Sequence, residues 1–220
     1  MAAGLGTRLH PLSERWPKPI LPIDGRPVIV TLLHELAAGG FDPLVVVTGH
    51  LADQVQELVA PLPYDIHFAS QPEPLGSADA VRRAHVEPPF LVTAADTVYR
   101  DGDPERFWRR FEDGGSAGAI SMRRQPGRPV GTRIRTEGGR VVKVVDPADE
   151  SGFTAAPLMV VGVPVARELA GDLPGPPFEL ATAFQRAIDA GERVDAIAIG
   201  NTRDLTDPLD LVEENFSYLR

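Results

Sequence analysis

The sequence of 220 residues predicts an α/β fold. Short apolar runs alternate with helical patterns along the first half of the chain, which is typical of a sheet with helices packed on it. Hydrophobic residues make up 43% of the chain, enough for a packed core. No low-complexity segment or internal repeat interrupts the pattern. We therefore expect a single domain over residues 1–220.

In the first half of the chain, short apolar runs predict strands and amphipathic segments predict helices. We expect strands at 44–48, 64–69, 90–94 and 117–122, and helices at 52–59, 77–85 and 104–112. This alternation predicts a Rossmann-like half over residues 1–125, with a mixed, mainly parallel sheet flanked by helices.

From residue 126 onward the pattern is richer in strands. The segments 131–136 and 141–145 flank Glu137-Gly138-Gly139, and together they predict a β-hairpin. Further strands are expected at 157–163 and 194–199, and helices at 178–190 and 208–218. Residues 126–220 are thus expected to form a small β-rich lobe with closing helices.

The start of the chain is a Gly-rich loop, Ala2-Ala3-Gly4-Leu5-Gly6-Thr7-Arg8. In Rossmann-like folds such a loop follows a strand, but only Met1 precedes it here. We therefore expect the first strand to be missing or truncated, and the natural protein to have about five to seven more residues upstream.

Composition excludes several classes of protein. The net charge of -9 disfavours binding to a nucleic-acid backbone, so we expect no nucleic-acid partner. The absence of cysteine excludes disulfides and Cys-ligated zinc, and the five histidines lack metal-ligand spacing. No apolar run approaches the roughly 20 residues of a membrane span, and no signal peptide is visible. We expect a cytoplasmic protein without a membrane partner, and a homo-oligomer stays open.

The basic residues are almost all arginine. Of the 22 lysines and arginines, only Lys18 and Lys143 are lysine. Together with the many Ala, Gly and Pro residues, this bias indicates a GC-rich, bacterial source.

Two motifs near the start of the chain suit phosphate chemistry. Small residues in the loop 2–8 let the backbone N–H groups approach phosphate oxygens, and Arg8 offers a planar fork of donors. The prolines of Pro17-Lys18-Pro19 are expected to hold Lys18 in stiff, extended backbone as a fixed charge. The alternatives are an ordinary Gly-rich turn and a surface lysine in a Pro-rich loop.

These motifs together resemble a known family. The run AAGLGTRLHPLSERWPKPILPIDGRPVI, residues 2–29, is similar to the signature of sugar-1-phosphate nucleotidylyltransferases, also called NDP-sugar pyrophosphorylases. Isoprenoid-type cytidylyltransferases resemble this segment too, but carry Gln where this chain has Pro19. The resemblance implies that Arg8 and Lys18 are catalytic. It also implies nucleotide contacts from Ala2, Ala3, Gly4, Gly6 and Thr7.

The segment Gln71 to Ala78 resembles the base-reading loop of the same family. Gln71 and Gly76 would then face the nucleobase, and Ser77 would lie near the nucleotide at the start of a helix. Ser77 also suits the N-cap of that helix.

Two aspartates are candidate ligands for Mg²⁺. Asp96 follows a buried strand, at the end where ligands bind in such sheets, and carboxylates suit Mg²⁺. A loop aspartate in an Asx-turn is the alternative. Asp204 matches the family's second metal ligand, although the usual Trp and Gly around it are absent. Asp207 instead suits the N-cap of the closing helix, with Pro208 in its first turn.

The resemblance implies sugar contacts from Gly131, Asp146 and Glu179. The family's Glu-Lys-Pro motif is replaced by Val145-Asp146-Pro147, which has no lysine. Lys143 lies three residues before Asp146, and therefore on the opposite face of a strand. Either Arg124 or Arg133 could supply the positive charge of the missing lysine. Glu179 also suits a helix start through the helix dipole alone.

The resemblance implies an enzyme of nucleotide-sugar biosynthesis that joins an NTP and a sugar 1-phosphate into an NDP-sugar and pyrophosphate. The amide of Gln71 can pair with uracil or thymine, which favours UTP or dTTP, while GTP stays open. One alternative is a nucleotidyltransferase for a non-sugar phosphorylated acceptor such as phosphocholine. Another is a non-catalytic regulatory subunit that binds nucleotide sugars.

Overall fold

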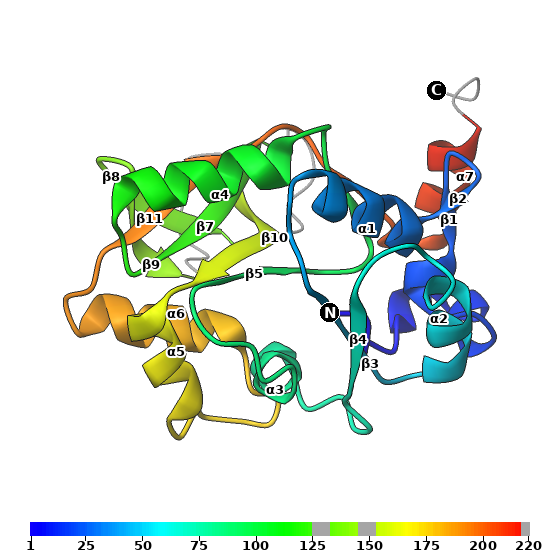
Figure 1. Ribbon diagram of the computed structural model, residues 1–220, viewed down its shortest axis with the longest axis horizontal. Coiled ribbons are helices and arrows are strands. Elements are labelled where there is room, and N and C mark those ends of the chain that lie inside the picture. The colour runs from blue at the N-terminus through cyan, green and yellow to red at the C-terminus, as the bar shows by residue number, and fades with distance from the viewer. Residues whose placement is uncertain (125–132, 145–152, 217–220) are drawn as a thin grey trace. The chain divides into compact units, whose positions relative to one another are not determined.

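The computed structural model describes residues 1–124, 133–144 and 153–216 (Figure 1). The chain forms two compact units. Unit 1 comprises Met1–Pro74, Ala94–Gly102 and Thr202–Arg220, and unit 2 comprises Leu75–Thr93 and Asp103–Asn201. The single domain with halves 1–125 and 126–220 that the sequence suggests stays a prediction.

The described part of unit 2 contains a six-stranded sheet in the order β5-β10-β7-β11-β9-β8. Its strands are β5 (Phe90–Thr93), β7 (Gly118–Arg124), β8 (Ile134–Glu137), β9 (Arg140–Val144), β10 (Phe153–Val161) and β11 (Val194–Ala198). The predicted mixed α/β sheet is confirmed. Parallel pairs were expected to predominate, but among these strands they do not. Strand β10 lies antiparallel between β5 and β7, and β7 and β11 form the parallel pair.

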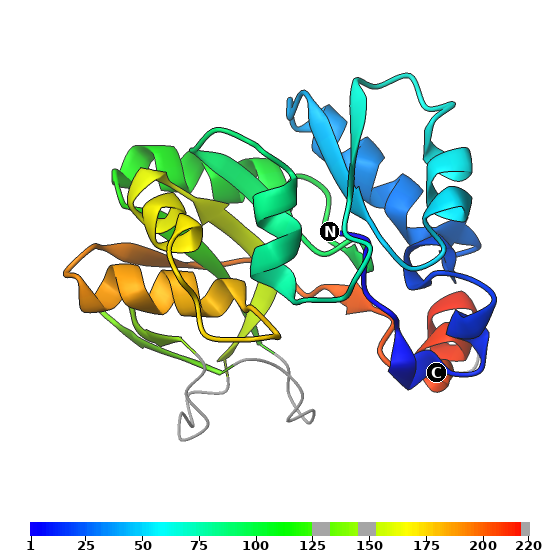
Figure 2. The same ribbon diagram turned by 90° about the horizontal axis from the view of Figure 1, so that it is seen from below.

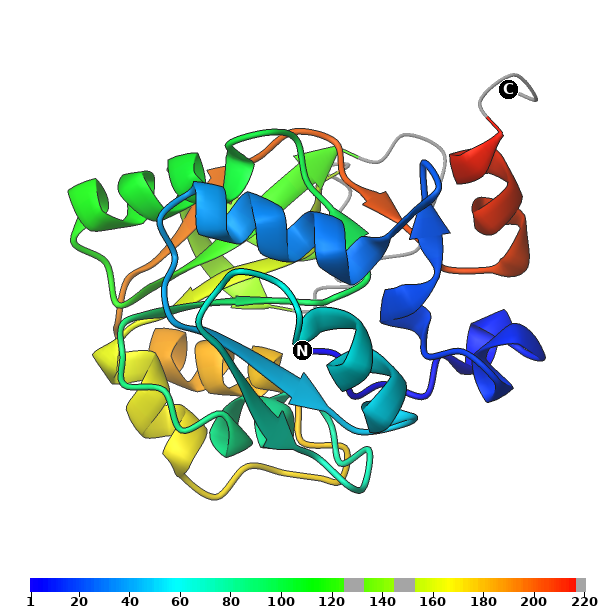
Figure 3. The ribbon, with the colours of Figure 1, turned by 45° about the vertical axis from the view of Figure 1, so that its right-hand side comes forward.

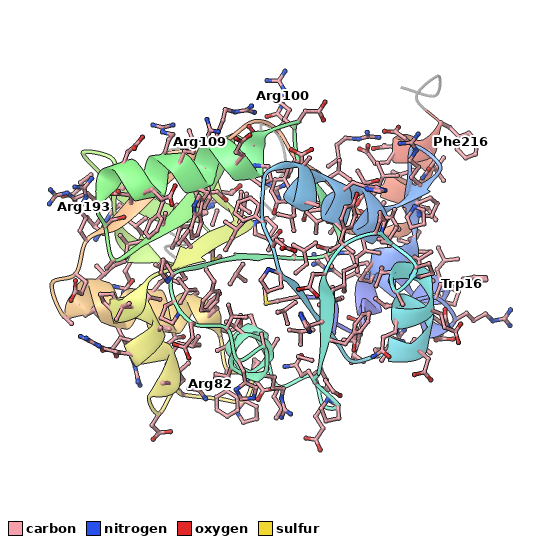
Figure 4. The ribbon with its side chains drawn as sticks, viewed as in Figure 1. Trp16, Arg82, Arg100, Arg109, Arg193 and Phe216 are labelled. Carbon is pink, nitrogen blue, oxygen red and sulfur yellow. The ribbon has the colours of Figure 1, made fainter. Side chains whose placement is uncertain are left out.

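Helices cover both sides of these strands. Figure 1 shows α4 (Asp103–Gly114) on one side, and α5 (Val163–Ala170) with α6 (Leu180–Asp189) on the other. Apolar side chains fix these helices: α4 buries Phe107 and Phe111, and α6 buries Phe184. Helix α5 was not predicted from the sequence, and its first residue, Val163, was expected at the end of a strand. Arg82 of α3 (Ser77–Arg83), labelled in Figure 4, donates to the carbonyl of Leu169 at the end of α5 (2.6 Å).

The predicted hairpin is confirmed as β8 and β9. Gly138 and Gly139 form its turn with φ of 57° and 78°, a left-handed conformation that glycine adopts without strain. Figure 2 shows α6 alongside this hairpin, and the side chain of Gln185 on α6 accepts a hydrogen bond from Val144 N (2.8 Å). The hairpin is thereby tied to the helix layer of unit 2.

Unit 1 is built from short elements. It contains β1 (Pro22–Ile23), β2 (Arg26–Pro27), α1 (Val28–Ala38), β3 (Leu44–Thr48), α2 (Ala52–Val59), β4 (Ile66–Ser70), β6 (Thr97–Val98), β12 (Arg203–Asp204) and α7 (Pro208–Asn215). The strands β3 and β4 pair in parallel, and Figure 3 shows α7 beside the β1–β2 pair. Helix α1 was not predicted from the sequence, and it buries Val28, Ile29, Leu32, Leu33 and Leu36.

The start of the chain lies beside β3. Ala2 N donates to the carbonyl of Val47 (2.7 Å), and Ala2 forms a single parallel bridge with Thr48. On its other side, Met1 O accepts a hydrogen bond from Ala95 N (2.9 Å). The first strand of a Rossmann-like fold, expected here to be missing or truncated, is thus represented among the described residues by the single bridging residue Ala2. None of the helices described here is both long and apolar enough to cross a bilayer.

Candidate active site

An apolar cluster brings the motifs of unit 1 together. Leu9 follows the Gly-rich loop, Leu21 follows Pro17-Lys18-Pro19, and Leu205 follows Asp204. All three side chains are buried in one cluster with Ile23 and Val28. Burial of these leucine side chains is favourable because it removes apolar surface from water. Since each leucine lies beside one motif, their packing in a common cluster also positions the polar residues of the three motifs.

The Gly-rich loop has a fixed conformation. Gly6 has a φ of 63° and caps a 3-10 turn, Thr7–Leu9. Its carbonyl accepts hydrogen bonds from Leu9 N and from the hydroxyl of Ser13, both at 2.8 Å. The fully buried Ser13 is held in turn by His50, whose Nε2 donates to its carbonyl (2.8 Å). Ser13 and His50 were not predicted from the sequence, because neither belongs to a recognisable motif.

Ala3 and Gln71 are packed against a glycine that the sequence analysis also missed. A Cβ on Gly49 would lie 2.6 Å from the carbonyl oxygen of Gln71 and 2.9 Å from Ala3. Gly49 therefore permits the loop start and Gln71 to close on the end of β3. Ala2, Ala3 and Gln71 are buried, with exposed fractions of 3%, 5% and 4%.

Lys18 and Asp96 form an ion pair, and both side chains are largely buried. The expectation of extended backbone at Lys18 was wrong, because Lys18–Ile20 forms a 3-10 turn and only Pro17 before it is extended. Two hydrogen bonds close this turn, from Ile20 N to Pro17 O (3.0 Å) and from Leu21 N to Lys18 O (3.1 Å). These bonds offset the tendency of a residue before proline to avoid helical backbone.

A cavity of about 300 Å³ lies within unit 1. Gly4, Gly6, Arg8, Lys18, Asp96 and Thr206 are among the residues that line it. The volume is in the range of small-molecule sites. The cavity thus joins the Gly-rich loop, two cations and a carboxylate, a combination suited to a polyphosphate with a bound cation.

Asp204 is brought next to Asp96 by strand pairing. Asp204 of β12 pairs with Thr97 of β6, the residue after Asp96. Beside it, Arg203 donates to both Asp24 and Glu214, with 2.9 Å from Nη2 to Asp24 Oδ1. The hydrogen bond to Asp24, followed by that to Glu214, raises the pKa of Arg203 above its ordinary value despite partial burial. This permanent charge anchors β12 to α7 and to the β1–β2 turn.

The donor set of Asp96 and Asp204 fits a hard divalent cation. Asp204 offers a carboxylate from β12, and Asp96 offers one from the residue directly before β6, the strand paired with β12. Across the described ranges, no group of three His, Asp or Glu side chains could hold a metal ion. Mg²⁺ fits such a pair, because it commonly binds one or two carboxylates and takes its other ligands from phosphates and water.

Unit 2 brings together Gly76, Ser77 and Glu179. Gly76 has a φ of 106°, and a Cβ there would lie 2.6 Å from Phe178 N, so only glycine fits. Phe178 is bonded on both sides, by Phe178 N to Leu75 O (2.7 Å) and Ala78 N to Phe178 O (2.8 Å). Residues 75–78 are therefore hydrogen-bonded to Phe178 on both sides, and we call these two segments together the strap.

The hydroxyl of Ser77 joins two helix starts. It donates to Glu179 Oε2 (2.6 Å) and accepts from Leu180 N (2.8 Å). The suggestion that Ser77 caps its own helix was wrong, because Gly76 is the N-cap of α3 and the hydroxyl satisfies an amide of α6 instead. Glu179 lies at the N-cap of α6, at a helix start as predicted, and its side chain is exposed.

The remaining residues considered for the acceptor come from the second half of the chain. Gly131 and Asp146 lie outside the described residues, as does the side chain of Arg124. Arg133 forms an isolated antiparallel bridge with Thr154 of β10, and Lys143 on β9 is exposed. The roles of Gly131, Asp146, Arg124 and Arg133 stay predictions. Near α7, the predicted N-cap is confirmed: Asp207 accepts from Leu209 N (2.9 Å) in a capping box with Asp210.

Comparison with known proteins shows the family to which the chain belongs. The family model for nucleotidyl transferases matches residues 1–132, and the chain belongs to this family. The resemblance to sugar-1-phosphate nucleotidylyltransferases is confirmed at the level of the family.

The relatives differ in what their names say they act on. The chain is 33% identical over 161 residues to a CMP-5'-(3-aminopropyl)phosphonate synthase of Streptomyces rubellomurinus, a match that covers 69% of this chain and 25% of that protein. It is 26% identical over 222 residues to a UTP–glucose-1-phosphate uridylyltransferase of Haloferax volcanii, covering 92% of this chain and 88% of the relative. This chain spans about a quarter of the length of the first curated relatives it matches.

A solved structure shares the fold. The UDP-glucose pyrophosphorylase from Acinetobacter baumannii superposes with a TM-score of 0.83 at 21% sequence identity, covering 99% of this chain and 90% of that chain. At this identity the likeness shows the fold, and it confirms the α/β class predicted from the sequence.

Proposed function

We propose that this chain transfers a nucleotidyl group from an NTP to a sugar 1-phosphate, giving an NDP-sugar and pyrophosphate. The observation that carries the proposal is the cavity of unit 1, which gathers the Gly-rich loop, Arg8, Lys18 and Asp96. Family membership and the relatives named for glucose 1-phosphate support it.

In the proposed reaction, a phosphate oxygen of the acceptor attacks the α-phosphorus of the NTP. A new O–P bond forms there as the bond to the bridging oxygen of the β-phosphate breaks and pyrophosphate leaves. Such transfers depend on positioning and on neutralisation of charge. Arg8 stabilises the leaving pyrophosphate, and Lys18 stabilises the charge that develops at the α-phosphate. The loop amides of residues 2–7 orient the polyphosphate.

The ion pair with Asp96 positions Lys18 before nucleotide binds. The backbone of Lys18 is fixed by the 3-10 turn, and its ammonium group is held by Asp96. A charge that is already in place does not have to move when the reaction begins. Asp96 and Asp204 are the residues that would hold Mg²⁺. When bound, the ion would neutralise phosphate charge and orient the reacting groups.

The base and the acceptor are assigned to other residues. Gln71 is proposed to read the nucleobase, with UTP or dTTP as the donor, and Gly76 to lie against the base. Glu179 is proposed to contact the sugar, as are Gly131 and Asp146. These roles rest on the resemblance of their segments to the family, and for Glu179 also on its hydrogen bond from Ser77.

A second acceptor class has a specific observation in its favour. The relative from Streptomyces rubellomurinus is named as a synthase of a CMP-phosphonate, and the chain lacks the lysine of the family's Glu-Lys-Pro motif. A phosphonate or phosphocholine acceptor with CTP is therefore the alternative. The sugar reaction remains the proposal because relatives named for it match over nearly the whole chain.

The experiment is a pyrophosphate-release screen of UTP, dTTP, GTP and CTP against a panel of acceptors. The panel contains glucose 1-phosphate, other sugar 1-phosphates, phosphocholine and 2-aminoethylphosphonate. We expect release with UTP or dTTP and a sugar 1-phosphate. Release only with CTP and a non-sugar acceptor would overturn the sugar assignment. No release with any pair would overturn the catalytic one.

A further inference from the structure

The segment that carries Asp204 alternates between two sides. The hydroxyl of Thr202 donates to Asp204 Oδ2 (3.3 Å), so these two residues share a side. Arg203 lies on the other side, bonded to Asp24 and Glu214, and Leu205 is fully buried in the apolar cluster of unit 1. In extended backbone, residues two apart point the same way. Thr206 is therefore expected on the side of Asp204.

The cavity agrees with this alternation. Thr206 lines it together with Arg8, Lys18 and Asp96. Thr206 is partly buried, and among the described residues its hydroxyl takes part in no hydrogen bond. The hydroxyl is not needed to cap α7 either, because Asp207 is the N-cap of that helix.

The backbone of Thr206 is held firmly. Its N–H donates to Asp210 Oδ2 (2.6 Å), which also accepts from Asp207 N (2.9 Å). The Asp210 side chain is buried, with 3% exposed, and belongs to the capping box of α7. A residue whose main chain is fixed in this way presents its side chain to a ligand with little loss of entropy on binding.

We propose that Thr206 is a further phosphate-binding residue of the unit 1 cavity. Its hydroxyl donates a hydrogen bond to an oxygen of the NTP polyphosphate or of the product pyrophosphate. A hydroxyl bound to a charged phosphate oxygen forms one of the stronger hydrogen bonds in proteins. The inference rests on the proposed function only in taking a polyphosphate as the ligand, and it holds for any acceptor.

The test compares Thr206→Val, which keeps the shape and removes the hydroxyl, with Thr206→Ser, which keeps the hydroxyl. Binding of pyrophosphate and of UTP, each with Mg²⁺, is measured by calorimetry. We expect Thr206→Val to weaken binding about tenfold and Thr206→Ser to stay within about twofold of the unchanged chain. In steady-state kinetics, Thr206→Val should raise the KM for the NTP and leave the KM for the acceptor unchanged.

Three results would overturn the assignment. These are unchanged binding in Thr206→Val, an equal loss in both variants, and no binding of either ligand by the unchanged chain. Thermal unfolding of each variant shows whether α7 and its capping box are intact. Failure of the proposed function is distinct from these results. If the protein turns over no sugar 1-phosphate, but Thr206→Val weakens pyrophosphate binding and Thr206→Ser does not, the proposed function fails and the assignment of Thr206 stands.

Discussion

In unit 1 a hydrophobic cluster holds the motifs of the candidate phosphate site together, whereas in unit 2 main-chain and side-chain hydrogen bonds hold Ser77 beside Glu179. Leu9, Leu21 and Leu205 each lie beside a motif and share one core. Ser77 and Glu179 meet 102 residues apart in the sequence, on a strap that Phe178 closes. The site in unit 1 collects charged side chains, whereas the segments in unit 2 are fixed by close contacts and hydrogen bonds. Substitutions in unit 1 should therefore affect chemistry, and those in unit 2 should affect stability and acceptor binding.

The largest effect is expected from Lys18→Met. Removing a positioned charge from a reacting phosphate should lower the turnover rate about 100- to 1000-fold without unfolding the chain. The control is Lys143→Met, which removes the chain's other lysine at an exposed position on β9 and should change the rate less than about twofold. Equal rates for both variants would remove Lys18 from the chemistry, and would favour the regulatory-subunit alternative.

Asp96→Asn should lower the turnover rate about 100-fold and raise the Mg²⁺ concentration needed for half-maximal rate, because the cation loses a carboxylate ligand. EDTA should stop the unchanged enzyme, and added Mg²⁺ should restore it. Asp53→Asn, at an exposed position of α2, is the matched charge control. Full activity in EDTA would show that no dissociable cation is needed at Asp96 and Asp204.

In unit 2, Gly76→Ala tests the strap. Its φ of 106° and the close approach of Phe178 both exclude a side chain, whereas Gly138 has a φ of 57° and no heavy atom within 4 Å of its Cβ position. We expect Gly76→Ala to lower the free energy of unfolding by about 2 kcal/mol more than Gly138→Ala. Urea denaturation measures both. Equal losses would mean that the contact with Phe178 does not constrain the loop.

The smallest effect is expected from Ser77→Ala. Loss of the hydroxyl that holds the exposed Glu179 should raise the acceptor KM about fivefold and leave the KM for the NTP unchanged. Ser77→Thr keeps the hydroxyl and should restore the acceptor KM. If the KM for the NTP rises instead, Ser77 contacts the nucleotide, as the sequence resemblance implied.

Much of the fold could be predicted, because each element has its own local pattern. The strand 44–48 and the helix 52–59 match β3 and α2 residue for residue. The insertion of β10 between β5 and β7 could not, because strand order is set by contacts distant in the sequence. The same limit applies to the site. Gly6 and Lys18 belong to a contiguous motif, but Ser13 and Gly49 matter through packing alone. Thr206 could have been found from its position two residues after Asp204.

The most direct test of the central claim, that the unit 1 cavity positions the α-phosphorus for attack, is to follow labelled phosphorus through a single turnover. We predict that label at the α-position of UTP or dTTP is recovered in the nucleotide-linked acceptor, and label at the γ-position in pyrophosphate. Recovery of γ-label on the acceptor or as inorganic phosphate would place the attack at the wrong phosphorus and contradict the account.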